Sequence, residues 1–104
     1  MVEYDAGEKR GERGYLRLHG AFVGDVSDKE LARALEHHYI DDGVVDIVVD
    51  LSGVEEISLE GVGILLSLLR QSRQRGKRLI IEHERGQVRE KLQITGVLRT
   101  LTGG

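Results

Sequence analysis

Hydrophobic and polar positions along the chain follow the period of a strand in some segments and that of a helix in others. Residues 15–19 alternate, with both leucines on one face, which predicts a half-buried strand. Residues 44–51 (VVDIVVDL) are almost continuously apolar and β-branched, which predicts a central strand covered on both faces. Two shorter strands are expected, at residues 2–6, antiparallel to 15–19, and at residues 79–81.

Three segments have helical periodicity. Ser27 and Glu30 form a capping box, in which the serine oxygen accepts from the amide of Glu30, and a helix is expected to follow as far as Tyr39. Two more helices are expected, at residues 61–74 and 87–95. The apolar residues expected to pack a short final turn onto the core are Val97, Leu98 and Leu101.

The resulting order is β-β-α-β-α-β-α, and it predicts an α/β fold. Strands that alternate with helices imply right-handed parallel crossovers. We expect a small mixed four-stranded sheet with helices mainly on one face. The 104 residues suit one domain, which we assign to residues 1–104, because domains commonly hold about 100–150 residues.

Composition excludes several classes of protein. Fifteen basic residues face eighteen acidic ones, and aromatic residues make up only 4%, which argues against nucleic-acid binding. The chain has no cysteine, as expected of a cytoplasmic protein. No apolar run approaches the roughly 18 residues that span a bilayer, and the polar N-terminus does not resemble a signal peptide, so direct membrane insertion is not expected.

Candidate chemistry concentrates in the turn at residues 52–63, which joins the central strand to the next helix. In α/β proteins, ligand sites lie where the carboxyl end of a strand meets a helix N-terminus, and the amides there favour negative charge. Gly61 and Gly63 allow close backbone approach. Glu60 places a carboxylate in or just before the first helical turn. This pattern fits either a binding site or a capping glutamate on an ordinary surface.

The residues around this turn resemble the signature of STAS domains, the fold of bacterial anti-sigma factor antagonists. Residues 50–54 (DLSGV) are similar to the family's Asp-Leu-Ser-Gly-Val block, and residues 61–65 (GVGIL) to its Gly-Leu-Gly-Val-Leu run. Weaker similarity at residues 16–20, 76–79 and 92–97 extends the resemblance over nearly the whole chain. The resemblance implies a regulatory protein-binding module.

The resemblance also implies a phosphorylation switch that is altered in this chain. Glu60 falls on the family's phosphoacceptor, Ser58 on its usual aspartate and Leu59 on its serine or threonine. Glu60 carries one permanent negative charge, against about −1.5 to −2 for phosphoserine. It either mimics the phosphorylated state or marks the loss of phosphorylation control. Ser58 is an alternative phosphoacceptor, and its other expected role is as the helix N-cap.

The surface implied to contact a partner has three parts. They are Gly24 with Asp25, the turn from Ser58 to Gly61, and exposed positions of the following helix. Ile64 lies beside the core stripe of that helix, where it either belongs to a wide buried face or forms an apolar patch. The family often has aspartate where this chain has Val23, and Asp25 replaces it only if the loop is one residue longer.

The implied partner is an anti-sigma factor or a switch-kinase-like regulator, which the domain would sequester so that a sigma factor is released. Three alternatives remain open. They are a STAS subunit of a membrane transporter or lipid-trafficking complex that docks on a cytosolic ATPase, a small-ligand or nucleotide sensor, and a structural domain without a switch; a weak homodimer is compatible with each.

The pattern shows neither a catalytic nor a metal centre. His37 and His38 are adjacent, so on a helix they point about 100° apart and cannot chelate one metal as i, i+4 histidines do. Glu55, Glu56 and Glu60 lie on a solvated turn, which gives no reason for their pKa values to separate as an acid–base pair requires. We therefore expect no enzyme activity, no metal and no cofactor.

Overall fold

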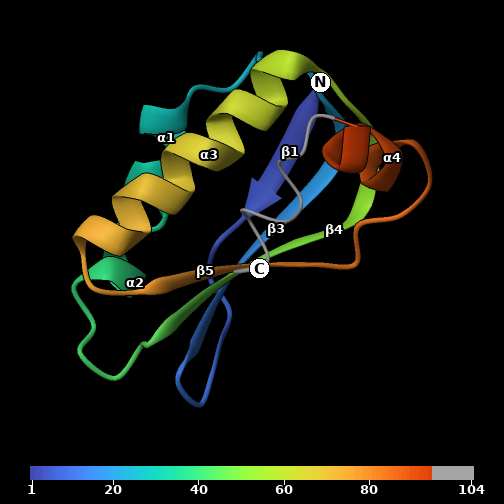
Figure 1. Ribbon diagram of the computed structural model, residues 1–104. Coiled ribbons are helices and arrows are strands. Elements are labelled where there is room, and N and C mark those ends of the chain that lie inside the picture. The colour runs from blue at the N-terminus through green and yellow to red at the C-terminus, as the bar shows by residue number, and fades with distance from the viewer. Residues whose placement is uncertain (95–104) are drawn as a thin grey trace.

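Figure 1 shows one layer of strands with helices packed against it. The computed structural model describes residues 1–94. In chain order the elements are β1 (Val2–Asp5), β2 (Lys9–Arg10), β3 (Arg13–Phe22), α1 (Asp28–Ala34), α2 (Glu36–Tyr39), β4 (Asp46–Ile57), α3 (Leu59–Gln74), β5 (Arg78–Glu82) and α4 (Gly86–Ile94). This order confirms the predicted α/β fold.

The sheet places β4 between β3 and β5, in the order β1-β3-β4-β5. β1 runs antiparallel to β3, whereas β4 is parallel to both of its neighbours. These pairings confirm the antiparallel first pair, the parallel crossovers and the central position of the apolar strand. A strand paired on both edges and buried on both faces is what a continuous apolar run predicts.

The sheet has five strands, not the four predicted. The additional strand is β2, which pairs with the start of β3 in the register Lys9↔Gly14 and Arg10↔Arg13. Gly11 takes a φ of 56° in the turn between them, a conformation that glycine adopts without steric cost. The prediction missed this hairpin because two polar residues carry no strand periodicity.

The two faces of β4 are covered by different kinds of side chain. Ile47, Val49 and Leu51 belong to the hydrophobic core, and the helices lie mainly on this side of the sheet (Figure 1). Asp46 and Asp50 alternate with them and therefore point to the other face. There they are buried beneath arginine side chains. The face of the central strand that points away from the core is therefore covered by ion pairs.

Some element boundaries differ from the prediction. Ser27 does cap a helix, because its Oγ accepts from the Glu30 amide at 3.0 Å, but the expected single helix is two helices that meet at Leu35. The His38 amide donates to the Leu35 carbonyl at 2.9 Å, a three-residue step that tightens the turn and places His38 and Tyr39 in the interior.

β4 runs further than predicted because its pairing with β3 continues through two register shifts. It ends at Ile57, and α3 begins at Leu59 instead of at Gly61. The final turn expected around Val97, Leu98 and Leu101 lies outside the described residues.

His38 is the one buried histidine among residues 1–94, with 2% of its surface exposed. Its Nε2 lies 2.7 Å from the carbonyl of Ala6. Its ring covers Gly14, where an added Cβ would come within 2.4 Å of the imidazole. Burial, reinforced by the neighbouring His37, lowers the pKa of His38 below its ordinary value of 6.5. The folded domain therefore favours the neutral ring.

The free energy of unfolding should fall as the pH drops below about 6.5, because the unfolded chain then binds a proton that folded His38 resists. The contribution is fully present above that pH. Urea unfolding at a series of pH values from 7.5 to 5.5 measures it. In His38→Gln the decline should be smaller, whereas the exposed control His19→Gln should retain it. Equal slopes in all three proteins would exclude His38 as the cause.

Candidate functional site

The turn between β4 and α3 is held by Ser58. Its Oγ accepts from the Gly61 amide at 3.2 Å, and its own amide donates to the Phe22 carbonyl at 3.1 Å. The first bond makes Ser58 the N-cap of α3, as expected. The second ties the turn to the end of β3. Ser58 as a phosphoacceptor stays a prediction.

Glu60 lies in the first turn of α3, where the structure brings it next to Gly24. A Cβ added to Gly24, whose φ is 97°, would lie 2.9 Å from the Cβ of Glu60. The pKa of Glu60 is lowered, first by its own backbone amide and then by the Ser58 hydroxyl. Asp25 accepts from the Val2 amide at 3.4 Å, which links this loop to β1.

The other residues expected at the site divide into buried and exposed groups. Gly61 is buried, and Ile64 is half-buried against the core. Leu59, by contrast, is 66% exposed. Val23 is 37% exposed. The prediction noted it only as a departure from the family's aspartate. Leu59, Glu60, Val23 and Gly24 together form what we call the turn surface.

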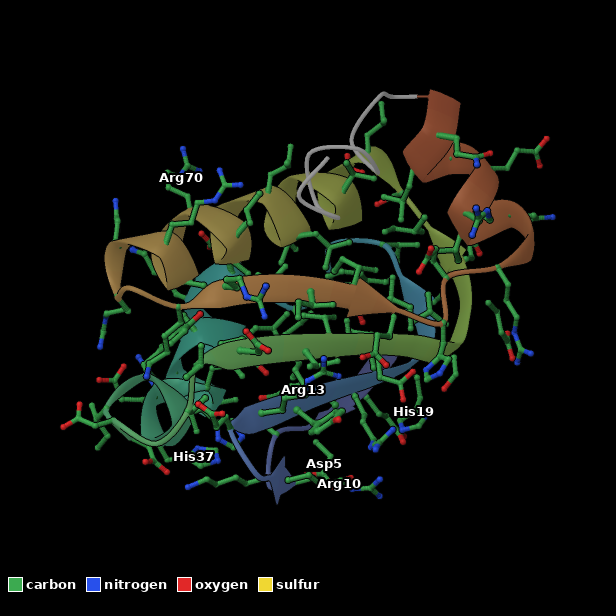
Figure 2. All side chains as sticks on the ribbon, turned by 60° about the horizontal axis from the view of Figure 1, so that its bottom comes forward. Asp5, Arg10, Arg13, His19, His37 and Arg70 are labelled. Carbon is green, nitrogen blue, oxygen red and sulfur yellow. The ribbon has the colours of Figure 1, made fainter. Side chains whose placement is uncertain are left out.

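A polar cluster on the helix-free face was not predicted. The carboxylate of Asp50 accepts from the Arg17 guanidinium and from the Ser52 amide at 2.9 Å, and it lies 3.0 Å from Nδ1 of His83. Burial acts to raise the pKa of Asp50, but hydrogen bonds from Ser52 and His83 outweigh it and hold the pKa below its ordinary value. Figure 2 looks toward this face, with Arg13 labelled.

Residues 1–94 contain no group of three His, Asp or Glu side chains placed to hold a metal ion. The rings of His37 and His38 lie against one another with a tilt of 40° and centroids 4.0 Å apart. No helix in the described part of the chain is both long and apolar enough to cross a membrane. What the turn surface offers chemically is an exposed apolar side chain beside an ionised carboxylate.

Comparison with known proteins found one family model that matches most of the chain. The family model described as "Mlab, STAS domain" matches residues 6–102. A search of curated proteins by sequence found no match.

Solved structures share the fold at low sequence identity. The anti-sigma factor antagonist SpoIIAA in its unphosphorylated form has a TM-score of 0.73 and 18% identity, over 92% of this chain and 83% of that chain. The murine anion transporter Slc26a9 has a TM-score of 0.73 and 16% identity, over 88% of this chain but only 15% of that chain. A sulfate transporter family protein from Wolinella succinogenes has a TM-score of 0.72 and 17% identity, over 88% of this chain and 73% of that chain. These likenesses concern the fold alone.

Proposed function

The chain belongs to the STAS domain family, and on that basis we propose that it is a protein-binding regulatory module that antagonises an anti-sigma factor. The observation that supports this most is the turn surface, where Leu59 and Glu60 are exposed at the capped start of α3. An exposed apolar side chain beside a charge, both on a capped helix turn, suits a protein contact. The likeness in fold to SpoIIAA is compatible with this function.

In the proposed mechanism the domain binds an anti-sigma factor, or a switch-kinase-like regulator, and so releases a sigma factor. Glu60 supplies one charge in place of the about −1.5 to −2 of a phosphoserine. Because its pKa is lowered, it stays ionised through the neutral range. The turn surface would then keep one fixed charge at Glu60. A cytoplasmic location and, at most, weak self-association belong to the same proposal.

Catalysis is not part of the proposed function. A general acid at neutral pH needs a carboxyl group whose pKa is raised by burial or by a like charge. Glu60 is exposed and its pKa moves in the opposite direction. Asp50 is buried, yet its pKa is lowered as well, because the hydrogen bonds that it accepts outweigh the effect of burial.

A second candidate is favoured by the likeness to the transporter structures. In Slc26a9 the matched region is 15% of the chain, so this fold occurs there as a small part of a larger protein. The equivalent proposal for this chain is a regulatory subunit of a membrane transporter or lipid-trafficking complex that docks on a cytosolic ATPase. The neighbouring genes discriminate the candidates: a histidine-kinase-like ATPase favours sigma regulation, and transporter genes favour the alternative.

Substitution of Glu60 tests the role of its charge. The regulator is first identified by affinity capture from the native host with mass spectrometry, and its affinity is then measured by calorimetry. Glu60→Ser should bind the regulator about tenfold more tightly, a difference of about 1.4 kcal/mol. The reason is that phosphorylation in the family releases the partner, and the substitution removes the charge that stands in place of the phosphate. Glu60→Gln should behave similarly. If both bind like the wild type while Ile64→Asp does not bind, Glu60 is only a charge at the helix end.

A further inference from the structure

One side of α3 carries a stripe of mostly exposed residues. Steps of three and four residues keep side chains on the same face of a helix. The members, hereafter the α3 stripe, are Leu59, Gly63, Leu66, Arg70, Arg73 and Gln74. Five of them, with Leu69, line a groove of about 690 Å³. Figure 2 shows Arg70 projecting from α3 away from the sheet.

Gly63 is the least expected member of the stripe, because a glycine inside a helix costs about 0.5–1 kcal/mol relative to alanine. The fold itself explains why residue 61 is a glycine, since a Cβ added to Gly61 would lie 2.4 Å from the Phe22 carbonyl oxygen. Gly63 has no such reason: apart from its chain neighbours and the nearby backbone of α3 itself, no atom of the described residues lies within 4 Å of a Cβ placed there. What its missing side chain provides is room for something outside the domain to approach α3 closely.

The charges of the α3 stripe indicate the charge of the partner that would approach it. The arginines of the sheet are paired, Arg17 with Asp50 and Arg78 with Asp46. Arg70 and Arg73 form no ion pair with any residue in 1–94 and are exposed. Two unpaired cations that line the same groove as Leu66 and Leu69 favour an acidic partner.

We propose that the α3 stripe seats an α-helix of the regulator, with close packing at Gly63, apolar contacts to Leu59 and Leu66, and acidic side chains against Arg70 and Arg73. The inference rests on the proposed function and specifies the chemistry of its partner. A helix fits because the stripe follows the axis of α3 over about four turns. A second copy of this chain fits poorly, because the α3 stripe contains no acidic side chain to meet Arg70 and Arg73.

Designed peptides of about 18 residues test this without a known regulator. The first peptide has leucines along one helical face, glutamates at one end and lysines at the other end. In the second peptide every glutamate of the acidic end is replaced by lysine and every lysine of that end by glutamate. Calorimetry should show the acidic-ended peptide binding about tenfold more tightly. Arg70→Glu/Arg73→Glu should reverse that preference, and Gly63→Gln should remove binding of both peptides. The backbone NMR shifts should change along α3.

The matched control is Lys29→Glu/Arg33→Glu, which makes the same change of charge at exposed positions of α1. It should leave the preference unaltered. No binding, equal binding of the two peptides, or an equal effect of the control would overturn the proposal. So would a loss of stability in Gly63→Ala, because the glycine would then serve the fold. If substitution of Glu60 changes the affinity for the regulator and Gly63→Gln does not, the proposed function stands and the α3 stripe is not the surface that binds the regulator.

Discussion

Gly61→Ala should lower the free energy of unfolding by about 2–3 kcal/mol, although alanine is ordinarily preferred over glycine in a helix. The added Cβ would lie 2.4 Å from the Phe22 carbonyl oxygen and 2.9 Å from Cγ1 of Ile57. The carbonyl cannot move freely, because it accepts the Ser58 amide that ties the turn to β3. Relief would require α3 to shift away from the sheet or that hydrogen bond to break.

Urea unfolding followed by circular dichroism measures this loss. Gly63→Ala is the matched control, because it makes the same chemical change two residues later in the same helix, where the described residues leave space. It should raise the free energy of unfolding by about 0.5–1 kcal/mol. If the two variants change stability alike, the close contact between the start of α3 and β3 is wrong.

Asp50→Asn should destabilise the domain by about 2–3 kcal/mol at neutral pH, because it removes a buried charge that its partners need. The carboxylate accepts from Arg17 and from the Ser52 amide, and it also lies against His83. Because folding lowers the pKa of Asp50, its contribution is fully present above the ordinary value of 3.8 and is lost as the pH falls through the folded-state value.

Asp46→Asn is the control for Asp50→Asn, since Asp46 is equally buried on the same strand and face. Its partners Arg78 and Arg13 have side chains that are 72% and 44% exposed, against 33% for Arg17, so water can replace more of the lost interaction. The loss should be smaller by about 1 kcal/mol or more. Chemical denaturation of both variants decides this, and a greater loss in Asp46→Asn would contradict the ranking.

The hydrophobic pattern was sufficient to predict the central strand and α3, because both have long periodic runs. It did not predict the break at Leu35, since Leu31, His38 and Tyr39 fit one helical stripe and only the tightened hydrogen bond reveals two helices. The hydrophobic pattern also did not predict the ion pairs on the face of the sheet that points away from the core. Asp46 and Asp50 stand out in an apolar run, but their arginines come from other strands, and the register that pairs them is not visible in one sequence.

The site was predicted in outline from the turn and its resemblance to a family. Ser58 as N-cap follows from the sequence because a serine precedes a helical run. Other features depend on tertiary contacts. The proximity of Gly24 to Glu60 depends on where β3 ends, and the difference between Gly61 and Gly63 depends on one carbonyl of Phe22. Two glycines that look alike in the sequence therefore have opposite expected effects.

The central claim, that the turn surface binds a regulatory protein, is tested most directly by the affinity of the captured native regulator for Leu59→Asp. Leu59 is 66% exposed, so the substitution leaves the core intact, and the control Ile40→Asp changes a residue that is 69% exposed at the end of α2. Calorimetry should show Leu59→Asp binding at least about tenfold more weakly, a loss of about 1.4 kcal/mol, with Ile40→Asp unchanged. Wild-type affinity for Leu59→Asp, or an equal loss for Ile40→Asp, would contradict the account.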